Sequence, residues 1–180
     1  MGVDVARLPR SRRTAATDSA AKSRHREDPS RYTRSCKSQR VLIADDNRDA
    51  AESLGVLLNL GGDEVLVVED GSAAVQAARD WRPDLAVLDL DMPVMNGFAG
   101  ALALRAEAPD LLLVALSAYL DEDNRGRAVA IGFDLCVMKG GEFADFRREL
   151  DALVQRHADR RSAAAMQAPV GADAAQSIST

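Results

Sequence analysis

The feature that most constrains this 180-residue chain is a repeated alternation of short apolar runs with helical patterns, between about residues 40 and 157. The apolar runs are continuous, which is typical of strands in a parallel sheet that is buried on both faces. Segments of helical periodicity separate the runs and supply the crossovers that parallel strands need. The pattern therefore predicts an α/β fold with a five-stranded parallel sheet and helices on both faces.

The expected elements follow directly from these runs. The predicted strands are 41–44, 64–68, 85–88, 111–116 and 133–138. The predicted helices are one that contains 51–58 and ends at Gly61, one that opens at Gly71, and three more over 98–106, 121–131 and 142–156. Glycine and proline fall between these segments, where they end helices and make turns.

Charge divides the chain into an arm and a body. Residues 1–40 hold 11 Lys/Arg and 4 Asp/Glu, a net of +7, whereas residues 41–180 hold 12 and 24, a net of −12. Residues 1–39 are basic and poor in apolar periodicity, so we predict a disordered arm. Residues 40–157 form the predicted domain, and 158–180 are predicted to be a disordered, Ala-rich tail. The arm is read as an extended tail, with contact to nucleic acid or an acidic partner as the alternative.

Other classes of protein find little support. No apolar run reaches the roughly 18–20 residues that a membrane helix needs, and no secretory signal opens the chain. Cys36 and Cys136 stand too far from other cysteines and histidines to suggest a disulfide framework or a metal site. We therefore expect a cytoplasmic protein without membrane contact.

Polar residues end four of the predicted strands. Asp45 and Asp46 follow the first strand, Asp89 the third, Ser117 the fourth and Lys139 the fifth. Because the carboxyl ends of parallel strands share one edge, these residues should converge. Crowded carboxylates favour a hard cation such as Mg²⁺, and an aspartate can accept a phosphoryl group. The alternative is that each residue simply caps a turn or a helix.

At these residues the chain resembles the receiver domains of bacterial response regulators, such as stand-alone chemotaxis regulators, and those of hybrid histidine kinases. The matching segments are 41–47, 85–97 and 116–118, together with Lys139. The loop after Asp89, with the sequence Leu-Asp-Met-Pro-Val-Met-Asn-Gly, is the most specific of them. The resemblance implies a flavodoxin-like fold with strand order 2-1-3-4-5 over about residues 40–157.

The resemblance also implies a role for each site residue. Asp89 would be the phosphoacceptor, Ser117 would follow the bound phosphoryl group, and Lys139 would pair with it. The implied Mg²⁺ ligands are Asp45, Asp46, Asp89 and the backbone carbonyl of Asp91.

Two positions depart from the family pattern. Gly140 follows Lys139 where family members usually have a proline, often with a cis bond. Cys136 stands where the family usually has an aromatic switch residue. We therefore expect altered coupling between Ser117 and the surface that would bind a downstream protein. Tyr119 or Phe133 is the alternative candidate for that role.

The function implied is a phosphorelay switch. A histidine kinase or phosphotransfer protein would phosphorylate Asp89, and a protein-binding surface would respond and engage a downstream protein. We expect no enzyme activity beyond self-phosphorylation and autodephosphorylation at Asp89, and no output or DNA-binding domain. One alternative is a receiver-like interaction module that needs no phosphate. A haloacid-dehalogenase-like phosphatase is disfavoured, because that family places its Asp-x-Asp motif on the first strand and follows it with Gly-Thr.

Overall fold

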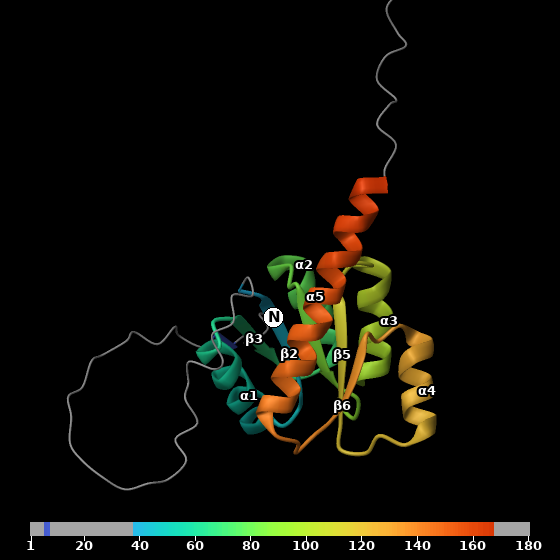
Figure 1. Ribbon diagram of the computed structural model, residues 1–180. Coiled ribbons are helices and arrows are strands. Elements are labelled where there is room, and N and C mark those ends of the chain that lie inside the picture. The colour runs from blue at the N-terminus through green and yellow to red at the C-terminus, as the bar shows by residue number, and fades with distance from the viewer. Residues whose placement is uncertain (1–5, 8–37, 168–180) are drawn as a thin grey trace, which may run out of the picture.

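A central sheet with helices on both of its faces forms the folded body of the protein (Figure 1). The computed structural model describes residues 6–7 and 38–167. The parallel strands are β2 (Arg40–Ala44), β3 (Glu64–Val68), β4 (Leu85–Asp89), β5 (Leu112–Ser117) and β6 (Leu135–Met138). They lie in the order β3-β2-β4-β5-β6. This arrangement confirms the predicted flavodoxin-like order 2-1-3-4-5.

The helices divide into two layers. They are α1 (Arg48–Leu60), α2 (Gly71–Trp81), α3 (Gly97–Glu107), α4 (Glu122–Ile131) and α5 (Phe143–Gln167). Side chains of α1 and α5, such as Leu58 and Leu150, pack on one face of the sheet. Those of α2, α3 and α4, such as Phe98 and Ala128, pack on the other. Among the described residues, no helix has the length and apolar character needed to cross a membrane.

Side chains at the helix starts explain where several helices begin. Asn47, Asp70, Asn96 and Asp121 each precede a helix, and each accepts a hydrogen bond from a backbone N–H in its first turn. Such caps satisfy donors that the first turn of a helix leaves free. Each cap follows a strand or its loop, so it sets the point at which the chain turns away from the sheet.

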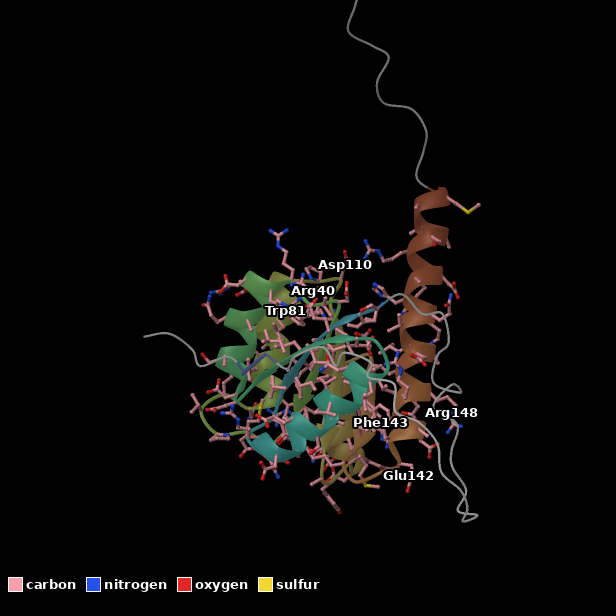
Figure 2. The ribbon with its side chains drawn as sticks, turned by 90° about the vertical axis from the view of Figure 1, so that its left-hand side faces the viewer. Arg40, Trp81, Asp110, Glu142, Phe143 and Arg148 are labelled. Carbon is pink, nitrogen blue, oxygen red and sulfur yellow. The ribbon has the colours of Figure 1, made fainter. Side chains whose placement is uncertain are left out.

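The amino-terminal end of the sheet is closed by contacts of Arg40. Its guanidinium lies over the Trp81 ring, 4.6 Å from the centroid, and its backbone N–H donates to the Asp84 carboxylate at 2.9 Å. Figure 2 shows Arg40 and Trp81 together at this end, and Asp110 lies there too. The phosphoryl-acceptor site predicted from the sequence lies at the opposite end of the sheet, where the parallel strands end.

The last helix is longer than predicted. α5 continues to Gln167 and projects beyond the sheet in both views (Figures 1 and 2), so the prediction of disorder was wrong for residues 158–167. The reason is local: Ala163–Ala165 have the highest helix propensity, and extending an existing helix needs no new nucleation. Residues 168–180 lie outside the described part of the chain.

The sheet also has a strand that the sequence did not predict. β1 (Ala6–Arg7) pairs antiparallel with β3, with Ala6 opposite Val67 and Arg7 opposite Leu66. The predicted disorder of the remaining arm, residues 1–5 and 8–37, falls outside the described residues. The arm therefore contributes an edge strand to a sheet that is otherwise parallel.

We expect Gly97→Ala to destabilise the fold strongly. A Cβ atom at Gly97 would lie 2.1 Å from the backbone oxygen of Asp89, so the loop after β4 would have to move. Overpacking of this kind should lower the free energy of unfolding by about 3 kcal/mol or more, as measured by urea denaturation.

Gly126→Ala is the matched control for Gly97→Ala. Gly126 lies inside α4, and nothing approaches its Cβ position within 4 Å. Alanine there should raise the free energy of unfolding by about 0.5–1 kcal/mol. Equal effects of the two substitutions would contradict the close approach of Gly97 to Asp89.

Candidate functional site

Residues from four neighbouring strands meet at the carboxyl edge of the sheet. Asp45 directly follows β2, Asp89 ends β4, Ser117 ends β5 and Lys139 directly follows β6. These four strands are adjacent in the sheet. The register therefore places the predicted site residues side by side, as the strand order required.

Three carboxylates form an acidic cluster at this edge. Asp45, Asp46 and Asp89 each offer an oxygen, and these oxygens lie within 4.8 Å of one another. Asp45 is 3% exposed and Asp89 is 4% exposed, whereas the side chain of Asp46 faces solvent. Like charges at this separation repel, so the cluster requires a cation beside it.

Lys139 supplies a cation to this cluster. Its Nζ lies 2.8 Å from Oδ2 of Asp45 and 2.8 Å from Oδ2 of Asp89. Burial lowers the pKa of the Lys139 ammonium, but the hydrogen bonds and charges of the two carboxylates outweigh that effect. The pKa therefore lies above its usual value of 10.5, and Lys139 is charged at neutral pH.

The second oxygens of the two buried carboxylates are held by the backbone. Oδ1 of Asp45 accepts a hydrogen bond from the Asn47 N–H at 2.9 Å, and Oδ1 of Asp89 accepts one from the Asp91 N–H at 3.3 Å. These contacts fix both carboxylates in the turns that follow their strands. Asp45 and Asp89 thus do form turn contacts, as the alternative interpretation proposed, while also sharing one charged cluster.

Main-chain hydrogen bonds hold the strand ends in register. The Asp45 N–H donates to the Val68 carbonyl at 3.2 Å, and the Lys139 N–H donates to the Ser117 carbonyl at 2.8 Å. Each charged residue is therefore anchored to a neighbouring strand at its own backbone. Little of the geometry of the cluster depends on flexible loops.

Ser117 lies at the same edge, but its hydroxyl is engaged elsewhere. Its Oγ donates to the Tyr119 carbonyl at 2.8 Å and accepts a hydrogen bond from the Tyr119 N–H at 3.1 Å. The residue is 1% exposed. The structure thus brings together Asp45, Asp46, Asp89 and Lys139, while Ser117 bonds to its own loop.

The residues proposed for an aromatic switch have different surroundings. Cys136 is half-buried on β6 and packs against the core under α2, α3 and α4, and this burial raises the pKa of its thiol. Tyr119 is 69% exposed. Phe133 is buried, with its ring edge-on to Phe98. Of these three, Tyr119 alone has a ring free to change position without opening the core.

The turn after Lys139 depends on glycine. Gly140 has a φ of +86°, a left-handed backbone conformation that residues with a Cβ atom rarely adopt. No peptide bond among the described residues is cis. The chain thus turns from β6 toward α5 without the proline that the family usually has.

The donor set fits a Mg²⁺ ion. Mg²⁺ prefers carboxylate and carbonyl oxygens and retains several waters, so a partly open acidic cluster suits it. Oδ2 of Asp45 and of Asp89 contact Lys139, which leaves Asp46 as the solvent-facing carboxylate of the cluster. Among the described residues, this is the acidic group whose oxygens converge closely enough to hold a metal.

A family comparison agrees with this geometry. The model of the response regulator receiver domain matches residues 41–151, which contain the whole acidic cluster and Lys139. The chain belongs to the response regulator receiver family. It is thus a receiver domain of the two-component type.

Curated relatives extend the comparison to whole proteins. The transcriptional regulatory protein PrrA of Mycobacterium tuberculosis is 35% identical over 134 residues, which cover 74% of this chain and 58% of PrrA. The DNA-binding response regulator MtrA of Mycolicibacterium smegmatis is 36% identical over 121 residues, covering 67% of this chain and 53% of MtrA. The chain spans a little over half the length of these relatives.

Solved structures of receiver domains share the fold. The receiver domain of the putative response regulator NarL from M. tuberculosis has a TM-score of 0.60 at 26% identity, covering 66% of this chain and 98% of that one. A CheY-like receiver from Methanospirillum hungatei has a TM-score of 0.66 at 19% identity, covering 69% and 99%. Because its identity is low, the similarity to the Methanospirillum receiver shows a shared fold and nothing more.

Two supporting residues of the site were not predicted. Gly97 allows α3 to start against the backbone of Asp89, and Asn47 contributes both a backbone donor to Asp45 and the cap of α1. Their positions, a glycine and an asparagine directly after strand-end loops, were the available signal. Their roles depend on backbone approach, which residue types alone do not reveal.

We predict that the stabilising effect of Lys139 is lost at high pH. The pKa of Lys139 is raised in the folded state, so its contribution is complete below about pH 10.5 and declines as the pH rises through the folded-state value. At pH 8, Lys139→Met should lower the free energy of unfolding by about 3 kcal/mol, because it leaves two buried carboxylates without a cation.

Urea unfolding of the two proteins between pH 8 and pH 11.5 measures this effect. The difference in the free energy of unfolding between wild type and Lys139→Met should become smaller as the pH rises. A constant difference across that range would show that Lys139 does not act through its charge.

Proposed function

We propose that this chain is the phosphoacceptor of a two-component phosphorelay, with Asp89 receiving a phosphoryl group from a histidine kinase or a phosphotransfer protein in the cytoplasm. The observation that carries the proposal is the position of Asp89: buried, within an acidic cluster, and 2.8 Å from the Lys139 ammonium. A carboxylate held beside a fixed positive charge is suited to accept an anionic group.

The chemistry requires one bond to form and one to break. An oxygen of the Asp89 carboxylate attacks the phosphorus of a phosphohistidine, the P–O bond forms, and the P–N bond breaks. The imidazole leaves as the neutral ring after taking up a proton. The domain itself catalyses only this transfer and the later hydrolysis of its own acyl phosphate, so we assign it no enzyme activity toward other substrates.

Lys139 and the acidic cluster would stabilise the negative charge of the transferred phosphoryl group in different ways. In the structure the Lys139 ammonium contacts Asp89 directly, so it is placed to contact an oxygen of the phosphoryl group after transfer. Asp45, Asp46 and Asp89, with the backbone carbonyl of Asp91, would hold Mg²⁺. When bound, Mg²⁺ would neutralise the charge that develops on the phosphoryl oxygens.

Ser117 is the proposed sensor of that charge. To donate a hydrogen bond to a phosphoryl group on Asp89, its hydroxyl must give up the bond that it donates to the Tyr119 carbonyl. Phosphorylation would therefore bias an equilibrium between two arrangements of this loop. The surface formed by α4, β6 and α5 would respond, and it already exposes apolar side chains: Val129 is 66% and Met138 is 60% exposed.

An apolar groove supports contact with a partner protein next to the site. Its lining includes Leu54 and Leu57 of α1, Phe143 of α5, and the site residues Asp45 and Lys139. We propose that the phosphodonor docks here, because apolar contacts would bring its phosphohistidine to the cluster. Figure 2 shows Phe143 at the site end of α5.

The output is proposed to be a protein contact. PrrA and MtrA are named as transcriptional and DNA-binding regulators, and the match covers only part of each. Within residues 38–167 the receiver is the folded unit, so this part of the chain would signal to a downstream protein rather than to DNA.

A second candidate is a receiver-like interaction module that works without phosphate. Cys136 favours it, because a small side chain at the switch position cannot couple Ser117 to the output surface as a ring does. The hydrogen bonds of Ser117 to its own loop favour it as well. The intact cluster of Asp45, Asp89 and Lys139 favours the phosphorelay instead.

The decisive test is phosphorylation by acetyl phosphate. With Mg²⁺ present, intact mass measured under mild conditions should increase by about one phosphoryl group. Asp89→Ala should abolish the gain because it removes the acceptor oxygen, whereas Asp91→Ala should keep it because only the backbone of Asp91 is assigned a role. The absence of any gain in wild type would favour the phosphate-independent module.

Magnesium should also stabilise the folded protein. A ligand at 100 times its dissociation constant adds about 2.7 kcal/mol to the free energy of unfolding. Wild type should show a rise of this order in urea titrations with increasing Mg²⁺, and Asp46→Asn should weaken it. Asp49→Asn removes an exposed charge of α1 that lies outside the cluster. This control variant should show the same Mg²⁺-dependent rise as wild type. Loss of the rise in both variants would point to a nonspecific ion effect.

A further inference from the structure

A large cavity lies at the amino-terminal end of the sheet, away from the acidic cluster. It has a volume of about 830 Å³ and lies where β4 and β5 begin. Its lining comes from the ends of α2 and α3, from the loops that lead into these two strands, and from the second half of α5. α5 projects past the sheet (Figure 1), so the part of this helix that the sequence did not predict supplies one wall of the cavity.

Much of the lining of this cavity is apolar. Leu104, Leu111 and Leu112 are buried residues of the lining, and Pro83 and Pro109 also contribute to it. Sites for small molecules are typically cavities of roughly 300–1,000 Å³ with an apolar lining and a few polar groups that fix the ligand. The cavity therefore has the size and the lining of a small-molecule site.

Two arginines supply polar groups to this lining. Arg82 comes from the loop after α2, and Arg161 comes from the extended part of α5. No carboxylate of the described residues pairs with either of them, whereas Arg79 of the same lining pairs with Glu107. Arg82 also has a φ of +49°, and backbone strain of this kind is found most often at functional sites.

The acidic side chains of the lining compete little for these two arginines. Glu107 is engaged by Arg79, and the Asp84 carboxylate accepts a hydrogen bond from the Arg40 N–H at 2.9 Å. Asp110, which lies at this end of the molecule in Figure 2, is exposed and has no partner among the described residues. Two guanidinium groups without a partner therefore outnumber one such carboxylate, which favours an anionic ligand.

We propose that this cavity binds a small organic anion, a molecule with a carboxylate or phosphate group on an apolar body. The apolar lining would contact the body of the ligand. The guanidinium groups of Arg82 and Arg161 would bind its charged group, because arginine donates paired hydrogen bonds to carboxylates and phosphates alike. The cavity and Asp89 lie at opposite ends of the sheet, so this inference does not depend on phosphorylation.

The test is a titration of the full chain, followed by amide NMR, with two probes that share a ring system: naphthoate and naphthyl phosphate. Saturable shifts are expected for the amides of Leu111, Leu112 and Ala158, which line the cavity. Those of Leu57 and Phe143, in the apolar groove next to the acidic cluster, should not move. Uncharged naphthalenemethanol should bind about tenfold more weakly than the better anion, because it offers no charge to the arginines. The tighter of the two anions would identify the charged group of the ligand.

Three variants test the role of charge in this cavity. Arg161→Ala should weaken binding of the better probe about fivefold, because it removes one of the two guanidinium groups. Arg156→Ala is the matched control: Arg156 is another exposed arginine of α5, lies outside the lining, and should leave the affinity unchanged. Asp110→Asn should tighten binding about twofold, because it removes a carboxylate that repels the anion.

Three results would overturn the proposal. One is the absence of saturable shifts at Leu111, Leu112 and Ala158 with either anion at millimolar concentration. Another is saturable shifts confined to Leu57 and Phe143, which would assign the probes to the groove. The third is equal affinity for the anions and naphthalenemethanol, which would show that the cavity does not select for charge.

Discussion

The structure depends most on the ion pairs that Lys139 makes with Asp45 and Asp89. Without them, two nearly buried carboxylates would face each other beside a third, and desolvation would oppose folding. The charged residues stand at the ends of hydrogen-bonded parallel strands, which hold their backbones in place. The same arrangement places the Asp89 carboxylate beside a positive charge, which suits the role of phosphoacceptor that we propose for it.

Ser117 and the loop that follows it would report on the state of the site. Ser117 is buried and bonded to Tyr119, while the family's aromatic position holds the half-buried Cys136. Tyr119 combines a backbone that holds the Ser117 hydroxyl with a ring that is largely exposed. Under the proposed function, a movement of Ser117 would therefore act on Tyr119 directly.

The sequence predicted those features that depend directly on residue type and position. Continuous apolar runs predicted the strands because only doubly covered strands tolerate them, and Asp45, Asp89 and Lys139 followed from strand ends and the resemblance to receivers. The sequence did not predict features that depend on a neighbouring part of the chain that has already folded. The extension of α5 through Ala163–Ala165 needed the preceding helix as its nucleus, and β1 needed the open edge of β3, which exists only once the sheet has formed. The hydrogen bonds of Ser117 depend on the turn that follows it, and residue type does not encode that turn.

The length of α5 has a mechanical consequence. The helix starts beside the turn of Gly140, at the site end of the sheet, and its 25 residues extend roughly 37 Å, past the opposite end. Its first half is clamped by Phe146, Leu150 and Leu153, while residues 158–166 are exposed. If the helix tilted as a rigid rod about Phe143, a tilt of about 5° would displace its far end by about 3 Å. A small change at the start of α5 would thus become a larger displacement at its exposed end.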